Sequence, residues 1–498
     1  MTESTDNPTV CAPRPAPRRR ARRWVGGLLT LTLVAAGAAA YRLDLVVPWY
    51  DHFFAAPAAP PPGPAEVAPP AGLELPPVPD VEAVAQPLPE PGAVSARKVE
   101  AAIAPFLADP NLGPRVLAAV DDLTTGRSLA RVGSGTAIPA STTKLLTSLA
   151  ALSALGPERT FQTRVVAGGS GTIVLVGGGD PYLMAEPNDQ DPLRYPERAD
   201  IATLAALTAQ ALRDQGRKRV SVGYDDSLFD GPRFNPAWPP SYAAEHVVSP
   251  ITALWVDQGR VPGSFRRVED PSASAAQAFA DALVAHGIKV QGAPARGVAS
   301  GAGAELASVS SAPVREIVAR VLEVSDNEAA EVLAHHVGLE VRGRGSFSAG
   351  TKGIVETLRG LGVETDGIEI YDGSGLSREN RISPEALLSV LRVAATGDGD
   401  LRTVIESLPV SGFTGSLTNR FDDAFPQSRG LVRAKTGTLT AVSSLAGIAI
   451  DQRGHALLFV LMADRIAKPD EDRAQVALDK AAGALAACRC GPRPRLTP

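Results

Sequence analysis

Stretches with the pattern of β-strands lie near both ends of the folded part of this sequence, and a long middle separates them. They are rich in apolar and β-branched residues and bounded by turn residues. The five stretches are 115–121, 128–132, 431–438, 442–450 and 455–462. A helix is expected before the first pair, around Val99, and another after the last stretch, over 470–487. We therefore predict an α+β fold in which both ends of the chain build one antiparallel sheet and the middle packs beside it.

The first 94 residues have the pattern of an export segment and a spacer. Arginines crowd residues 1–23, and an uncharged run, Trp24–Tyr41, follows directly. We predict that 24–47 is a transmembrane anchor with its basic side in the cytoplasm, or else a signal segment that is cleaved near Ala38–Ala40. Residues 51–94 are rich in proline and alanine and are expected to form a semi-rigid spacer. Both alternatives place the rest of the chain on the extracytoplasmic face of the cell envelope.

Charge and composition exclude several classes of function. The formal net charge is -5 over 498 residues, and no basic stripe appears beyond the first residues, so we expect no nucleic-acid partner. The six histidines lack metal-ligand spacing, and the pair His335-His336 is expected to be partly exposed on a helix. We expect neither a metal nor an organic cofactor. Cys488 and Cys490 form a disulfide or remain two thiols on the C-terminal tail, residues 488–498.

The first motif that carries chemistry is Ser141-Thr142-Thr143-Lys144. Leucines repeat at helical spacing after it as far as Gly156, so Ser141 is expected at the start of a helix with Lys144 on the same face. A serine hydroxyl becomes a strong nucleophile when a nearby base takes its proton, and a desolvated lysine can be that base. Taken alone, the pattern also fits a helix N-cap beside a solvated lysine.

Two further motifs follow along the chain. Ser325-Asp326-Asn327 lies between two helical stretches, so its hydroxyl and amide are expected at a helix–helix junction that faces a cleft. Helix capping explains the same residues equally well. Lys435-Thr436-Gly437-Thr438 is expected on a strand, where the glycine leaves room for a substrate backbone to lie alongside. An ordinary strand end also fits this third motif.

Together and in this order, the three motifs are those of class A β-lactamases and penicillin-binding proteins. Lysine usage supports this interpretation. Only eight of the 49 lysines and arginines are lysine, yet the sequence keeps lysine at both Lys144 and Lys435. Arginine stays protonated at any biological pH, so it could not serve as the base for Ser141.

The spacing of the motifs predicts an insertion. Ser141 and Ser325 lie 184 residues apart, and Ser325 and Lys435 lie 110 apart. A compact β-lactamase needs far fewer residues before its second motif. Residues 161–307 are therefore expected to form an inserted, β-containing domain.

The chain resembles the S13 family of D-Ala-D-Ala carboxypeptidases, the penicillin-binding protein 4 group also called DacB. The similar phrases are Pro139–Lys144, Gly178–Pro181, Tyr371–Arg378 and Gly412–Leu417. The resemblance implies a penicilloyl-serine transferase (β-lactamase-like) domain over 95–160 and 308–487, with an antiparallel sheet flanked by helices and an all-helical subdomain. Many relatives nest a third domain in the second; here little more than Val256–Asp270 is available, so we expect it to be absent or vestigial.

The resemblance also implies the activity, a serine-type D-Ala-D-Ala carboxypeptidase or endopeptidase that cleaves peptidoglycan stem peptides and is inhibited covalently by β-lactams. Ser141 is expected to attack the carbonyl of the penultimate D-alanine, with Lys144 as base. Ser325 is expected to pass a proton to the leaving D-alanine, with Lys435 holding the Ser325 hydroxyl.

The same resemblance implies the substrate contacts. Asn327 is expected to bind the substrate amide, and Thr436 and Thr438 its terminal carboxylate, with Gly437 leaving room beside them. Backbone N–H groups of Ser141 and Thr438 are expected to form the oxyanion hole.

Two alternatives stay open. The chain could be a β-lactamase, which needs a positioned carboxylate to hydrolyse the acyl-enzyme quickly, or a catalytically silent peptidoglycan-binding homologue. The balance of carboxypeptidase and endopeptidase action, and the oligomeric state, are open too. So is stem-peptide specificity, because the segment Trp238–Tyr242 lacks the aspartate that helps some relatives to select the amino end of a diaminopimelate side chain.

Overall fold

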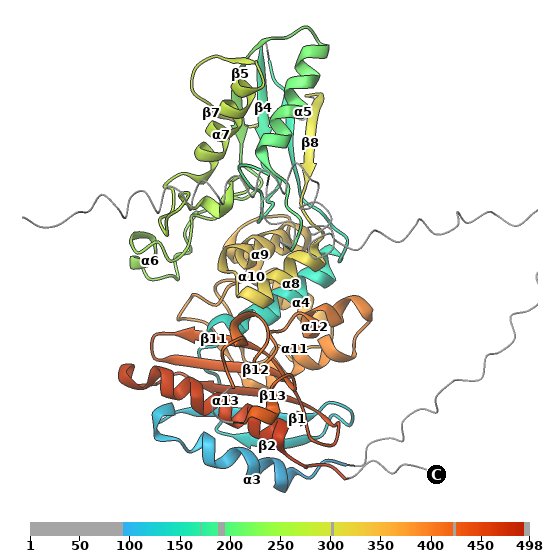
Figure 1. Cartoon of the computed structure of the whole chain (residues 1–498), viewed down its shortest axis with the longest axis vertical. Coiled ribbons are helices and arrows are strands. Elements are labelled where there is room, and N and C mark those ends of the chain that lie inside the picture. Colours follow the sequence, from blue (N-terminus) through green and yellow to red (C-terminus); the bar gives the residue numbers. More distant parts are fainter. Residues whose placement is uncertain (1–92, 170, 188–194, 300–302, 422–424, 493–498) are drawn as a thin grey trace, which may run out of the picture. The chain divides into compact units, whose positions relative to one another are not determined.

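The computed structural model describes residues 93–169, 171–187, 195–299, 303–421 and 425–492 (Figure 1). The predicted anchor or signal segment, 24–47, and nearly all of the predicted spacer lie outside these residues. Among the helices that the structure describes, none is both long and apolar enough to cross a membrane.

One five-stranded antiparallel sheet unites the two ends of the described chain. Its strands are β1 Val116–Asp122, β2 Ser128–Val132, β11 Val432–Leu439, β12 Val442–Ile450 and β13 Ala456–Ala463. They lie in the order β11-β12-β13-β1-β2, and β1 pairs with β13 from Val116 opposite Ala463 to Asp122 opposite Leu457. The predicted α+β fold, with one sheet assembled from both ends, is confirmed.

Alternating apolar side chains give this sheet two buried faces. Leu117 and Ala119 of β1 point into one hydrophobic cluster, and Ala118 and Val120 into another. Helices α3 (Ala96–Leu107) and α13 (Glu471–Ala487) pack on the second face, as Figure 1 shows. Each buried leucine or valine contributes about 1.5–3 kcal/mol through the removal of apolar surface from water.

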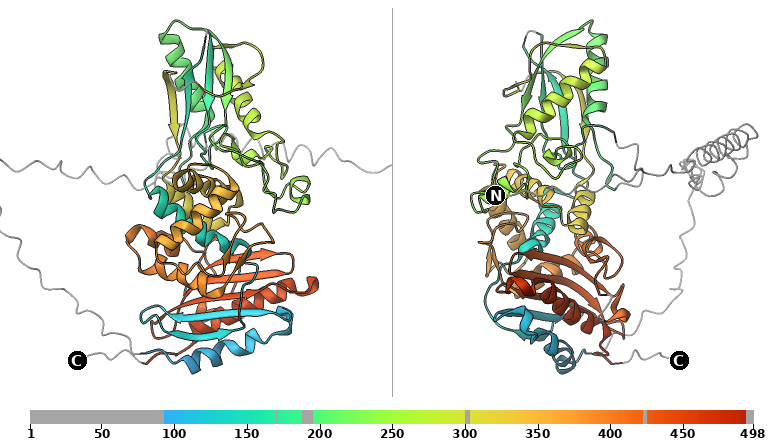
Figure 2. Two further views of the ribbon diagram at one scale, coloured as in Figure 1. Left: turned by 180° about the vertical axis from the view of Figure 1, so that it is seen from behind. Right: turned by 60° about the vertical axis from the view of Figure 1, so that its left-hand side comes forward.

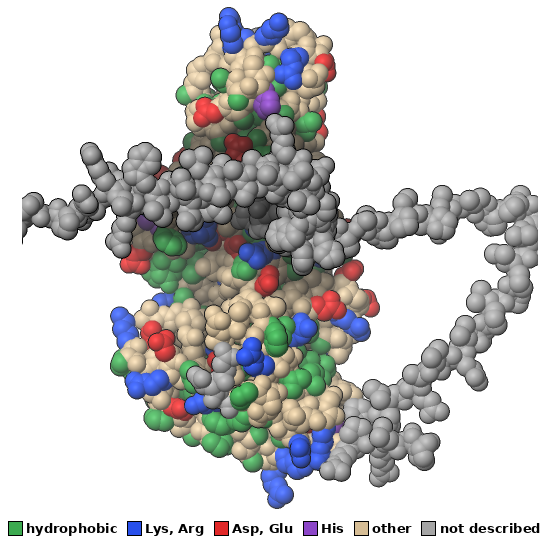
Figure 3. Space-filling view, in the orientation of Figure 1, with side chains coloured by type: hydrophobic (Ala, Val, Ile, Leu, Met, Phe, Trp, Pro, Cys, Tyr) green, Lys and Arg blue, Asp and Glu red, His purple; other side chains and the backbone are tan. Residues whose placement is uncertain are grey.

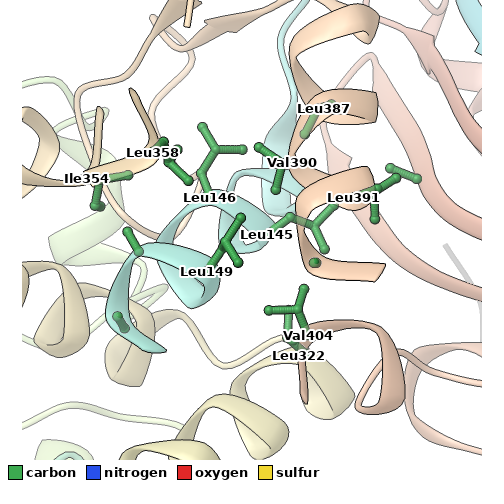
Figure 4. Close-up of a cluster of buried hydrophobic side chains, with 14 of the residues drawn as sticks. Leu145, Leu146, Leu149, Leu322, Ile354, Leu358, Leu387, Val390, Leu391 and Val404 are labelled. Carbon is green, nitrogen blue, oxygen red and sulfur yellow. The ribbon is translucent and has the colours of Figure 1, made fainter. Parts of the chain in front are cut away.

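Helices from the middle of the chain cover the first face. They are α4 Lys144–Leu155, α8 Val314–Val324, α9 Asn327–Arg342, α10 Phe347–Gly360, α11 Pro384–Thr396 and α12 Thr403–Glu406. Helix α4 is central, because Leu145, Leu146 and Leu149 are fully buried among side chains of α8, α10, α11 and α12 (Figure 4). Burial of α4 from several sides fixes the helix that begins directly after Ser141.

A second sheet is formed by the residues between α4 and α8. Its strands are β3 Gln162–Ala167, β4 Thr172–Val176, β5 Arg219–Asp225, β6 Lys289–Val290, β7 Ala295–Arg296 and β8 Glu305–Ser310. The order is β6-β5-β4-β3-β8, with β7 beside β5, and β4 and β5 are parallel. Helices α5 (Ile201–Asp214) and α7 (Pro271–Ala285) share its core. Strand β8 crosses the expected limit between 307 and 308, and the domain limits stay a prediction.

The remaining elements are short. They are α6 Ser241–Ala244, β9 Ile368–Glu369, β10 Arg381–Ile382 and the 3₁₀ turns η1 Pro110–Leu112, η2 Ala140–Thr143, η3 Asp257–Gly259, η4 Gly399–Arg402, η5 Gly415–Leu417, η6 Pro426–Ser428 and η7 Lys468–Asp470. The segment expected to hold at most a vestigial third domain contains only η3 and one bridge between Arg260 and Arg267.

Two details settle open points of the sequence. Cys488 and Cys490 are joined in a disulfide. The expectation that His335 and His336 are partly exposed is wrong, because both are buried. The ring of His336 stacks on Phe161 and its Nε2 lies 2.9 Å from the carbonyl oxygen of Gly179. Residues of the insertion contact both histidines, and the helical spacing of the sequence does not predict this burial.

Charged side chains of both signs share the surface. Figure 3 shows lysines and arginines near aspartates and glutamates on the visible face of the described chain. The expected lack of a nucleic-acid partner stays a prediction.

Candidate active site

Ser141 lies in the turn η2, immediately before α4. The preceding residue, Ala140, has φ 48, a left-handed conformation that is costly for a residue with a Cβ atom. The turn is held against the sheet because the Ser444 hydroxyl on β12 donates a 2.6 Å hydrogen bond to the Pro139 carbonyl. The half-buried Ser141 hydroxyl is thereby fixed at the N-terminal end of the buried α4 helix.

Gly437 allows β11 to approach that turn. A Cβ atom at Gly437 would lie 2.5 Å from the Pro139 carbonyl oxygen and 3.1 Å from the backbone nitrogen of Ser141. Any side chain would therefore push the strand away from Ser141. The glycine expected to leave room for a substrate also lets the strand pack on the turn.

Lys144 is fully buried and points at Ser141. Its Nζ lies 3.0 Å from Ser141 Oγ, 2.7 Å from Asn327 Oδ1 and 2.7 Å from the Ser374 carbonyl oxygen. Burial lowers the pKa of Lys144 to about 8, against the raising effect of nearby carboxylates, led by Asp372 and Glu331. A lysine with this pKa releases its proton near neutral pH, as a general base must.

Ser325 and Asn327 occupy the junction between α8 and α9. Ser325 ends α8 with φ 61, a left-handed conformation, and Asn327 begins α9. Between them Asp326 caps α9 by accepting a 2.9 Å hydrogen bond from the Ala329 N–H. The junction holds Ser325 and Asn327 two residues apart, and the Asn327 amide oxygen reaches Lys144.

Lys435 brings the third motif to the same place. It is fully buried, and its Nζ donates to Ser325 Oγ over 2.8 Å and to the Thr436 carbonyl over 3.0 Å. Burial and the neighbouring Lys144 hold the pKa of Lys435 well below its usual range. The Thr436 hydroxyl shares a 2.8 Å hydrogen bond with Ser416, and Thr438 is exposed on β11 opposite Ser443.

The structure therefore brings most of the predicted residues together, in two hydrogen-bonded groups. Ser141, Lys144 and Asn327 are linked directly, and Lys435 links to Ser325. Gly437 touches the Ser141 turn, and Thr436 and Thr438 continue along the same strand. Among the described residues, no group of three or more His, Cys, Asp or Glu side chains could hold a metal ion.

The buried groups behind Lys144 were not predicted from the sequence. The fully buried Glu331 accepts hydrogen bonds from the N–H groups of Gly373 and Ser374, which orients the Ser374 carbonyl toward Lys144. Burial, together with Asp372, raises the pKa of Glu331 to about 8. The only sequence signal for this loop is the segment Tyr371–Arg378, which resembles the S13 family.

Asp372 connects this loop to the insertion. Its carboxylate accepts hydrogen bonds from the N–H groups of Gly375 and Ser377 and from the side chain of Asn380. Trp238 donates a fourth, from its indole N–H over 2.7 Å. The segment Trp238–Tyr242 thus fixes a carboxylate close to Lys144.

Comparisons with known proteins give a consistent result. The sequence profile of the D-Ala-D-Ala carboxypeptidase 3 (S13) family matches residues 99–265 and 263–485. A carboxypeptidase of Mycobacterium tuberculosis is 34% identical over 442 residues, which cover 87% of this chain and 90% of that protein. The carboxypeptidase DacB of Mycolicibacterium smegmatis is 33% identical over 487 residues, 96% of this chain and 100% of that protein.

A solved structure supports the fold. The crystal structure of penicillin-binding protein 4 (dacB) from Haemophilus influenzae superposes with a TM-score of 0.64 at 21% sequence identity, and the match covers 78% of this chain and 98% of that one. At this identity the likeness shows the fold alone.

The chain belongs to the D-Ala-D-Ala carboxypeptidase 3 (S13) family. Within that class of hydrolases it is a serine-type D-Ala-D-Ala carboxypeptidase.

Proposed function

We propose that Ser141 is the nucleophile of a D-alanyl-D-alanine carboxypeptidase/endopeptidase that cleaves peptidoglycan stem peptides through an acyl-enzyme. The observation that carries the proposal is the 3.0 Å approach of the buried Lys144 amine to Ser141 Oγ. With a pKa of about 8, roughly a tenth of Lys144 is neutral at pH 7, and that fraction can accept the serine proton.

Acylation joins Ser141 Oγ to the carbonyl carbon of the penultimate D-alanine. The proton of Ser141 moves to Lys144 Nζ, and the carbon–nitrogen bond then breaks. Ser325 supplies the proton that the departing D-alanine amine needs. The proton that Lys144 accepted from Ser141 then returns to Ser325. The 2.8 Å contact with Lys435 supports this role by fixing the Ser325 hydroxyl. Water then hydrolyses the ester and restores Ser141.

Backbone N–H groups of Ser141 and Thr438 are proposed to stabilise the oxyanion. The close packing of Gly437 against the Ser141 nitrogen supports this, because it brings β11 beside the nucleophile. Two N–H donors aimed at the developing charge are an established source of rate enhancement in acyl transfer.

The proposed substrate contacts come from β11 and from the junction between α8 and α9. Asn327 is proposed to bind the substrate amide, and Thr436 and Thr438 the terminal carboxylate, with Lys435 adding positive charge nearby. The proposed substrate is a peptide that ends in D-Ala-D-Ala. A D-alanyl-D-alanine carboxypeptidase of Actinomadura, 30% identical over 429 residues, supports this assignment. β-Lactams are proposed to acylate Ser141, since the H. influenzae penicillin-binding protein was crystallised with one.

The family is one of cell-wall enzymes, which indicates a role in the envelope. We propose further that residues 24–47 anchor the chain in the membrane or export it as a cleaved signal. The catalytic domain is proposed to comprise 95–160 and 308–487, interrupted by 161–307. N-terminal sequencing of the mature protein from a membrane fraction distinguishes the anchor from the cleaved signal.

Digestion of purified muropeptides, with products identified by mass spectrometry, tests the proposed activity. Loss of one D-alanine from pentapeptides indicates carboxypeptidase action, and separation of cross-linked dimers indicates endopeptidase action. Ser141→Ala is expected to abolish both, whereas Ser153→Ala, at an exposed serine of the same helix, retains them. Fast turnover of nitrocefin would contradict the proposal in favour of a β-lactamase. Absence of cleavage would favour a silent homologue.

A further inference from the structure

Backbone strain in this molecule gathers around the candidate site. Non-glycine residues with a left-handed φ are uncommon and persist where their surroundings hold them. The described residues in this conformation are Ala140, His246, Asp257, Gln258, Ser325, Phe421 and Ala441. Two of them belong to the site itself. Three others, His246, Asp257 and Gln258, lie in one segment of the insertion, 246–267, which we call the clamp segment.

Gln258 makes the first contact between the clamp segment and the site. Its φ is 55, and its side-chain amide donates to both carboxylate oxygens of Asp326, over 3.0 and 2.9 Å. Asp326 is the residue between Ser325 and Asn327 and caps α9. The strained backbone of Gln258 is fixed in turn, because its carbonyl accepts a hydrogen bond from the Ser249 hydroxyl.

Arg267 makes the second contact, on the other side of Asn327. Its guanidinium lies 2.7 Å from the carboxylate of Glu328, and only 8% and 4% of the two side chains are exposed. The strained His246 supports this contact, since its Nδ1 accepts a 3.2 Å hydrogen bond from the Arg267 N–H. A carboxylate as buried as Glu328 requires such a partner.

Asn327 therefore lies between two side chains that the insertion holds. A shift of its backbone would change the geometry of these two contacts. The amide oxygen of Asn327 lies 2.7 Å from Lys144 Nζ, so the position of the junction also sets the hydrogen bonding of the proposed base. A small displacement of a reacting group can cost about 100-fold in rate.

We propose that the clamp segment is a positioning element, in which Gln258 and Arg267 hold Asp326 and Glu328 and thereby place Asn327 against Lys144. The inference rests on the proposed function of Ser141 and Lys144. It gives the insertion a part in the reaction, although none of these clamp residues needs to touch the substrate.

The test measures the rate at which a fluorescent penicillin labels the full-length protein. Gln258→Met keeps the length of the side chain and removes the amide donor. We expect labelling to slow about tenfold, with a melting temperature unchanged within about 1 °C. The matched control is Gln277→Met, because Gln277 makes a similar hydrogen bond to Asp281 on the exposed face of α7, and it should label at the wild-type rate.

A double variant separates positioning from general damage. If Gln258 acts through Asn327, then Gln258→Met adds little further loss to Asn327→Ala, and the two effects are not additive. Fully additive effects would overturn the proposal, as would wild-type labelling by Gln258→Met, or a slowed rate that tracks a lowered melting temperature. Arg267→Lys retains the charge and is expected to slow labelling less than Gln258→Met does. If the wild-type protein itself is not labelled, the proposed function fails instead.

Discussion

The candidate site has two walls, each with one fully buried lysine, and the two lysines have different surroundings. On the helical wall, Lys144 contacts Ser141, Asn327 and Ser374, and the charges of Asp372, Glu331, Asp326 and Glu328 partly offset the effect of burial. On the strand wall, burial and the neighbouring Lys144 both lower the pKa of Lys435. The two lysines are equally buried, but the charges around them differ, and so do the influences on their pKa values. The carboxylates leave Lys144 with a pKa of about 8, suited to proton transfer.

Arginine substitutions at the two lysines test this difference and have the largest expected effect on the acylation rate. Lys144→Arg leaves a cation that cannot give up its proton, so we expect acylation to fall by about 1,000-fold or more. Lys435→Arg retains a donor to Ser325 but changes its geometry, so a loss of about ten- to a hundredfold is expected. Second-order rates of penicillin labelling measure both, with melting temperatures as controls for folding. Equal losses in the two variants would contradict the difference between the walls.

The contact between the walls can be tested at Gly437. Gly437→Ala places a methyl group against the Pro139 carbonyl and the Ser141 nitrogen, so β11 must move away from Ser141. We expect acylation to slow by roughly ten- to a hundredfold. Gly360→Ala is the control, because open space surrounds that glycine at the end of α10. If Gly437→Ala is labelled at the wild-type rate, acylation does not depend on the close approach of β11 to Ser141.

The sequence predicted the strand wall more completely than the helical wall, for a physical reason. Lys435, Thr436 and Gly437 are consecutive on one strand, so their arrangement follows from local structure. Ser374, Glu331 and Gln258 reach the site only through tertiary packing, and no local pattern marks them. The same limit explains the wrong expectation for His335 and His336. His336 contacts Phe161 and Gly179, more than 150 positions earlier in the chain, and His335 contacts Phe229 and Phe347.

The charge on the helical wall predicts a shift in pH dependence. Acylation should rise with pH through about 8, as Lys144 loses its proton. Asp326→Asn keeps a side chain able to cap α9 and removes a charge that raises the pKa of Lys144. The rising limb of the labelling rate should therefore move to lower pH, by roughly a few tenths of a pH unit. Asp200→Asn, at the cap of α5, is the matched control and should not move it. A shift to higher pH would contradict the assigned cause.

The smallest expected effect on activity concerns a buried histidine in the second half of α9. Burial lowers the pKa of His336 to about 3. Between pH 6.5 and 3 the unfolded chain therefore binds a proton that the folded chain does not, and stability falls as the pH falls through this window, by a few kcal/mol at most. Denaturant unfolding measures how the free energy of unfolding changes with pH. This dependence should be weaker in His336→Gln than in wild type, and unchanged in His286→Gln, at an exposed histidine. Labelling rates at neutral pH should change little in either variant.

Mass spectrometry of the penicillin-treated protein tests the central claim most directly. After proteolysis, the account predicts one penicilloyl adduct, on the peptide that contains Ser141, and no adduct in the Ser141→Ala variant. An adduct on another serine, or equal labelling of the Ser141→Ala variant, would contradict it.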